Sequence, residues 1–132
     1  MNARGKGVLL AFCLVATAAV PVLAHHSISA EFDPSKEFSV DGVISQVDWI
    51  NPHIAVHVMV KDEKVGAGDW SCEGSPPATY RRAGLQRSDF KIGEEVTLTC
   101  ASPKDGSKRW GFLKMIKYHS DGHVLVLRIG GE

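Results

Sequence analysis

The residues best suited to chemistry are six histidines, because imidazole nitrogens bind metals and exchange protons near neutral pH. They are His25, His26, His53, His57, His119 and His123. If the chain is cut after Ala24, His25 becomes the first residue, and its α-amine and ring can chelate one metal. One further imidazole would complete a three-nitrogen set, the histidine brace, which suits copper(II). We therefore predict a copper site built from His25 with His53 or His26; the alternative is an unstructured polar chain end.

Weaker candidates lie along the second predicted strand and beside it. His57 and Met59 share the strand face that also carries His53, and a thioether there would favour copper(I). Glu73, on the next strand, could accept a hydrogen bond from a ligand histidine and so orient its ring. For each of these side chains the alternative is an ordinary solvent-facing strand position.

An export signal precedes the histidines. Residues 1–24 are typical of a signal peptide: Arg4 and Lys6 give a basic start, an apolar run of 13 residues occupies 8–20, and small Ala24 ends the segment. The run is shorter than the roughly 20 residues that cross a bilayer, so we expect cleavage rather than a retained anchor, and no membrane span afterwards. The mature protein is then predicted to be periplasmic or secreted.

The remaining chain, residues 25–132, is long enough for one domain with its own core. It holds thirteen basic and fifteen acidic side chains, and this net charge of −2 gives no electrostatic case for nucleic acid. Two cysteines remain, Cys72 and Cys100. An even count in an oxidising compartment predicts a disulfide between them; two buried thiols are the alternative.

Apolar alternation and turn signals divide this part into strands and one short helix. After an extended N-terminal arm at 25–36, the β-barrel domain at 37–132 is predicted to hold strands at 37–49, 54–61, 69–74, 94–101, 110–118 and 123–129, with a helix at 75–84. Ser75 could cap that helix. The alternation of the first strand slips by one at Gly42, as at a β-bulge. This element order predicts a mainly β fold, a small OB-like β-barrel of five to six strands with one short helix between strands 3 and 4. A β-sandwich is the alternative, and it gives the helix no role.

Enzyme signatures are missing: the chain has no Gly-rich phosphate loop, no Gly-x-Ser-x-Gly and no zincin motif. An enzyme is therefore less expected than a binding protein, and no catalytic residue is assigned.

Three functions stay open: a periplasmic metal-binding protein, a metal-free binding module for a small molecule, glycan or partner protein, and an oxidative enzyme with a brace copper. In the second, Trp49, Trp70 and Trp110 would line the ligand site, although core packing is the preferred interpretation. His119 and His123 flank a turn and are interpreted as a structural pair.

Several short motifs resemble those of one family of small exported bacterial proteins. They are His25-His26-Ser27, Glu31-Phe32-Asp33, Trp49-Ile50-Asn51-Pro52-His53, Gly74-Ser75-Pro76 and Arg81-Arg82-Ala83-Gly84. Over nearly the whole mature chain, the sequence is similar to the domain of unknown function 6152. The resemblance implies a periplasmic β-barrel-like domain with no established activity, and His25, His26 and His53 match its histidines. Members typically have Arg-Arg-Gly after the helix, whereas here Ala83 intervenes.

Overall fold

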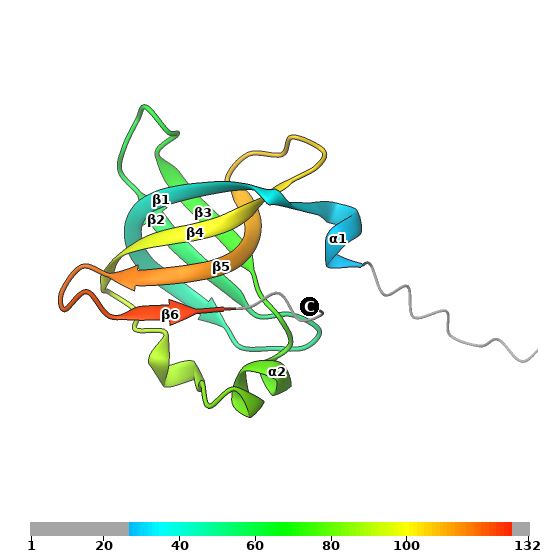
Figure 1. Ribbon diagram of the computed structural model, residues 1–132. Helices are drawn as coiled ribbons and strands as arrows, with labels where there is room; N and C mark the ends of the chain where they lie inside the picture. Colours follow the sequence, from blue (N-terminus) through cyan, green and yellow to red (C-terminus); the bar gives the residue numbers. More distant parts are fainter. Residues whose placement is uncertain (1–26, 128–132) are drawn as a thin grey trace, which may run out of the picture.

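The chain folds into a closed β-barrel with one extra strand and few short helices. The structure, a computed structural model, describes residues 27–127. Its elements in chain order are α1 (Ile28–Glu31), β1 (Phe32–Asp48), β2 (Ala55–Val60), β3 (Gly68–Glu73), α2 (Pro77–Arg82), the 3-10 helix η1 (Arg87–Asp89), β4 (Glu95–Pro103), β5 (Trp110–Tyr118) and β6 (Val124–Val126) (Figure 1).

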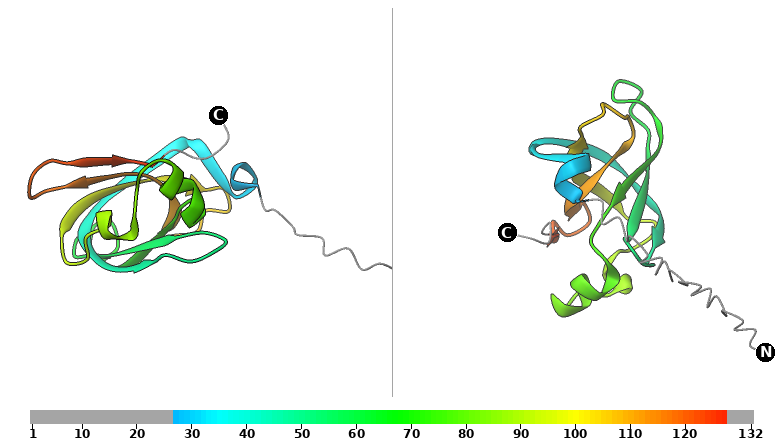
Figure 2. Two further views of the ribbon diagram at one scale, coloured as in Figure 1. Left: turned by 90° about the horizontal axis from the view of Figure 1, so that it is seen from below. Right: turned by 90° about the vertical axis from the view of Figure 1, so that its right-hand side faces the viewer.

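The barrel closes because β3 pairs with β5 as well as with β2. The strand order is β3-β2-β1-β4-β5-β6, and every ladder along it is antiparallel. The closing ladder between β3 and β5 is parallel and has three residue pairs, from Ser71 with Trp110 to Glu73 with Phe112. Figure 2 shows α2 and η1 across one end of the barrel and α1 at its side. The predicted OB-like barrel, with its helix between the third and fourth strands, is confirmed.

The core follows the alternation of the strands. Ile54, Val56, Val58 and Val60 are all at most 2% exposed, as their spacing predicts. Burying one such side chain stabilises the fold by about 1.5–3 kcal/mol relative to leaving it in water. The intervening side chains of β2 lie on the outer face, where His57 and Met59 are partly or largely exposed. The alternation therefore separates a dry interior from a polar outer face.

The first strand begins earlier than the sequence predicts. Residues 28–31 form a single helical turn, and β1 begins at Phe32 rather than at Glu37, in place of an extended arm through residue 36. Phe32 is 1% exposed, and its ring lies 5.5 Å from that of Phe112 and 4.6 Å from that of Trp110. An isolated Phe among polar residues gives no periodic signal, so this tertiary contact was not visible in the pattern.

The bulge in β1 is real, but it lies after Ile44 and not at Gly42. The register of β1 against β2 shifts between Ile44 and Gln46, whereas Gly42 pairs regularly with Val96 of β4. Gly42 has a different role, since a Cβ there would lie 2.8 Å from the carbonyl oxygen of Met59. It allows β1 and β2 to approach closely.

The short helix also begins later than predicted. Its first residue is Pro77 and its N-cap is Pro76, with no side-chain capping bond, so Ser75 is not the cap. The carbonyl of Ser75 instead accepts from the Ile54 N–H at 3.3 Å, and its own N–H donates to the Tyr80 hydroxyl at 2.9 Å. Ser75 thus still belongs to the contact between the β2 and β3 ends. None of the described helices is long and apolar enough to cross a membrane.

Candidate functional site

His53 and Glu73 meet at one end of the outer face. His53 follows the cis Asn51-Pro52 bond just before β2, and Glu73 is the last residue of β3. Register pairs Glu73 with Ala55, so its side chain is diagonal to His53 on the same face. The His53 Nδ1 lies 3.3 Å from Glu73 Oε2, and the two side chains are 30% and 34% exposed.

This contact defines how the His53 ring is oriented. An ionised carboxylate only accepts hydrogen bonds, so Nδ1 carries the proton and donates it to Glu73. In the neutral ring Nε2 then has a lone pair, and within residues 27–127 this nitrogen has no hydrogen-bond partner. An imidazole held by a carboxylate through one nitrogen, with the other nitrogen open, has the usual arrangement of a metal-ligating histidine.

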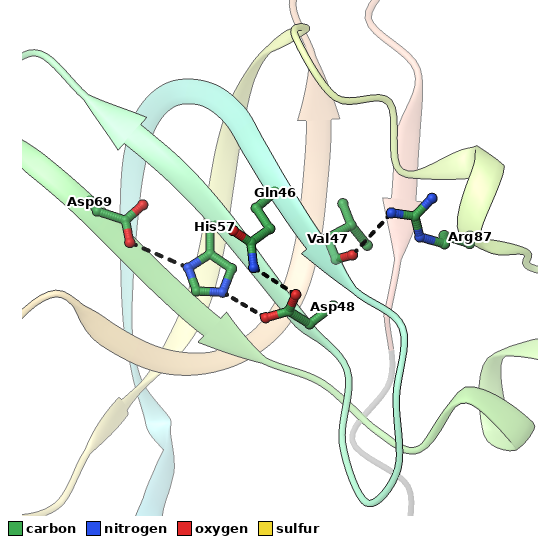
Figure 3. A network of polar contacts seen from close by, with 6 residues as sticks. All are labelled: Gln46, Val47, Asp48, His57, Asp69 and Arg87. Carbon is green, nitrogen blue, oxygen red and sulfur yellow. Dashed lines mark hydrogen bonds and ion pairs between the residues drawn. The ribbon is translucent and has the colours of Figure 1, made fainter.

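His57 lies between two carboxylates on the same outer face (Figure 3). Its Nε2 is 3.1 Å from Asp48 Oδ2, at the end of β1, and its Nδ1 is 3.3 Å from Asp69 Oδ2 on β3. Gln46 donates to the other Asp48 oxygen at 2.7 Å. This hydrogen bond is the main cause that holds the pKa of Asp48 below its usual value; burial opposes it, and the contact with His57 lowers the pKa further. Arg87 donates to the carbonyl oxygen of Val47 at 3.4 Å.

The candidate ligands on β2 do not converge on one point. His53 and His57 are four residues apart, which is roughly 13 Å along a strand, and each ring has its own carboxylate partner. Met59 is 43% exposed and lies two residues beyond His57. Among residues 27–127, no group of three or more His, Cys, Asp or Glu side chains is arranged to hold a metal. The predicted partners of His53, His25 and His26, lie outside the described residues.

Cys72 and Cys100 form the predicted disulfide. Both residues are fully buried, and they join β3 to β4 across the barrel interior. Cys72 is also paired with Gly111 of β5, so the covalent link lies beside the parallel ladder that closes the barrel.

A second polar cluster involves His119, which the sequence pattern does not connect with its partners. The Thr97 hydroxyl donates to Asp41 Oδ1 at 2.6 Å, and its oxygen lies 2.9 Å from His119 Nε2. Since Thr97 has only one hydroxyl proton, His119 Nε2 is the donor in the second contact. His123 stacks on the Tyr118 ring. An open hollow of about 240 Å³ adjoins this cluster, lined by Asp41, Gly42, Val43, Met59, Lys61, Asp62, Glu95 and His119.

The three tryptophans pack on other aromatic rings. Trp49 lies 5.4 Å from Phe90, Trp70 lies 5.6 Å from Phe38, and Trp110 contacts Phe32 as described above. Their preferred interpretation as packing residues fits these contacts.

Fold and outer face together define a small OB-like β-barrel, closed by a parallel ladder and a buried disulfide, with histidine–carboxylate contacts on its outer surface. The chain belongs to a family of unknown function, DUF6152, whose model matches residues 12–112. Comparisons with the curated proteins and with the solved structures gave no match.

Proposed function

We propose that the protein is an exported, periplasmic or secreted domain that binds copper(II) through His25 and His53. The observation that carries the proposal is the orientation of His53: Glu73 holds Nδ1 at 3.3 Å and leaves Nε2 open at the surface. The role that fits such a domain is trafficking, buffering or tolerance of copper rather than catalysis.

The chemistry of the donor set favours copper(II). The His53 imidazole would supply one nitrogen, and the amine and ring of His25, freed by cleavage after Ala24, would supply two more. Copper(II) stands at the top of the affinity order for such nitrogen ligands. His26 could supply the third nitrogen in place of His53. Met59 would not take part, because six residues of strand separate it from His53 by roughly 20 Å, and the set therefore lacks the thioether that favours copper(I).

Covalent geometry limits where the new terminus can be. His25 is two residues before Ser27, the first described residue, so only His26 separates the new terminus from the described part of the chain. The helical turn α1 and the buried Phe32 follow directly. If cleavage frees the amine of His25, so short a connection to the folded barrel would lower the entropy cost of closing the chelate.

A copper(II) titration of the mature protein tests the proposal. The protein is secreted to the periplasm, and mass spectrometry first establishes that it begins at His25. The matched control carries one extra residue before His25, and a His53→Gln variant removes the second donor. We expect one-to-one binding that weakens at least about tenfold in both, a loss of about 1.4 kcal/mol of binding free energy each. Equal affinity in the authentic and extended proteins would exclude the amine as a ligand.

The second candidate is a metal-free binding module. The hollow beside His119 favours it, because it is an open concave surface lined by both charged and apolar residues. Its volume of about 240 Å³ is below the range of drug-sized ligand pockets, so only a small ligand would fit. Absence of specific copper binding to the authentic mature protein would make this candidate the working model.

A further inference from the structure

A second apolar cluster lies on the outside of the barrel. Its members come from α1, β1, β4 and β5, and they are Ile28, Phe32, Ala101, Trp110 and Phe112. A Cβ at Gly111 would lie 2.7 Å from the ring of Phe38, which packs on the interior core. Side chains alternate along a strand, so Trp110 and Phe112, on either side of Gly111, lie on the opposite, outer face of β5. We call these five residues the outer cluster.

Lys104 holds the backbone of α1 against this cluster. It directly follows β4, its Nζ donates to the Ser29 carbonyl at 2.5 Å, and its backbone N–H donates to the Glu31 carbonyl at 2.8 Å. Carbonyl groups at the end of a helix have no partner within the helix, so Lys104 provides two donors that α1 itself cannot supply. A single helical turn is unstable on its own in water. The position of α1 therefore depends on Lys104 and on the contact of Ile28 with the outer cluster.

The outer cluster adjoins the candidate copper site. Phe112 pairs with Glu73 in the parallel ladder between β5 and β3, so their side chains are neighbours on the same outer face. Glu73 in turn contacts His53 Nδ1 at 3.3 Å. In Figure 1 the N-terminal end of α1 points toward the barrel end that carries α2, and the connection between β1 and β2, which contains His53, lies at that end too. α1 is thus held on the strand that neighbours Glu73.

We infer that Lys104 and the outer cluster are positioning residues for copper(II): by holding α1 in place, they keep the attachment point of the mature N-terminus close to His53. This inference rests on the proposed function. Ile28, the first residue of the outer cluster, is three residues after His25; with α1 released, the first would be Phe32, seven residues after His25. The effective concentration of a flexibly tethered group falls roughly as the −3/2 power of tether length, so release of α1 should weaken copper(II) binding about fourfold.

The experiment compares the copper(II) affinity of the wild type and of an Ile28→Ser/Lys104→Met double variant, both secreted and beginning at His25. The substitutions remove the apolar contact and the Nζ bond of α1 but leave Phe32 in the outer cluster. Lys108→Met is the matched control, because Lys108 is exposed in the same β4–β5 connection and has no polar contact among the described residues. We expect about fourfold weaker binding in the double variant and unchanged binding in the control. Lys104→Met alone, which leaves the outer cluster intact, should show a smaller loss in the same direction.

A purely structural role for the outer cluster is the alternative, because Trp110 and Phe112 also belong to the ladder that closes the barrel. The same double substitution, made in the protein with one extra residue before His25, decides between the two roles. Its copper(II) affinity should stay unchanged there, because the position of the chain end no longer matters once the His25 amine cannot chelate. Equal losses of affinity in the authentic and extended proteins would overturn the inference, since they would show an effect on the barrel itself.

Amide hydrogen exchange of the metal-free proteins establishes whether α1 is released. We expect faster exchange in the double variant at Ala30 and Phe32, whose N–H groups donate within this turn, and unchanged exchange in β2. Unchanged exchange at Ala30 and Phe32 would show that these contacts do not hold α1 and would overturn the inference. Faster exchange with unchanged copper(II) affinity would overturn it as well but leave the proposed function intact. Equal affinity of the authentic and extended wild-type proteins would overturn both.

Discussion

Replacing both Cys72 and Cys100 by alanine removes the covalent link between β3 and β4 and should cost several kilocalories of stability. The two residues are 28 positions apart in the chain. For a loop of that length the chain-entropy relation gives about 3.6 kcal/mol at 25 °C. Both sulfur atoms are buried, so a small packing loss adds to this value. Domains of this size are stable by about 5–15 kcal/mol, and the variant should therefore still fold.

The position of the disulfide predicts where the variant should open first. The barrel is closed by only three parallel residue pairs between β3 and β5, and Cys72 is in the central one. The other ladders are longer, with the exception of the β5–β6 ladder outside the ring. Amide hydrogen exchange should accelerate most in residues 71–73 and 110–112, because these strands lose the covalent tether beside their short ladder.

Urea unfolding of the oxidised wild type and the double variant measures the magnitude. With a slope of about 1–1.5 kcal/mol per molar urea, the midpoint should fall by roughly 2.4–3.6 M. Wild type with the disulfide reduced is the control for the substitutions themselves and should behave like the variant. A stability difference below about 1 kcal/mol, or faster exchange spread evenly over all strands, would refute the reasoning from loop length and ladder position.

Three further substitutions test individual contacts. Glu73→Gln should weaken copper(II) binding about tenfold, because the ring of His53 loses its charged acceptor. An Asp69→Asn protein serves as the control. Equal copper(II) affinity in the wild type and both variants would exclude an orienting role for Glu73. Gly111→Ala should destabilise the fold by about 1–3 kcal/mol in urea unfolding, since the new Cβ would lie 2.7 Å from the Phe38 ring and 2.8 Å from a backbone oxygen; an unchanged midpoint would show that the ring moves freely. Tyr118→Phe should cost about 1–3 kcal/mol by the same assay, because its hydroxyl donates to the Asp89 carbonyl and accepts from the Lys91 N–H. A neutral result there would mean that water replaces both bonds.

The sequence predicts the elements of the barrel well where periodicity is strong. Strand β5 has the predicted bounds, 110–118, and β2 buries the predicted apolar residues. The disulfide followed from the count of cysteines and the inferred compartment. These features depend on local alternation or composition, and both are visible in one chain.

Other features depend on register, which a single sequence does not display. Asp48 and Asp69 reach His57 only because the ladders place them on diagonals of its own strand position, and neither spacing is a motif. The slip of the apolar alternation predicts a bulge at Gly42, whereas the extra residue follows Ile44. The sequence predicts that Glu73 orients a ligand histidine, but only the pairing of the β2 and β3 ends identifies His53 as its partner.

The disulfide also fixes how many strands the ring can contain. A sixth strand could enter a closed ring between β3 and β5, where the ladder is shortest, and this would move β3 away from β4 by one more interstrand spacing of about 4.8 Å. The Cα atoms of Cys72 and Cys100 are held 6.8 Å apart, which leaves no room for that step. β6, which pairs with the same edge of β5 beyond the ladder with β3, is thereby kept outside. The circumference of the barrel is set by a covalent bond as well as by hydrogen bonds.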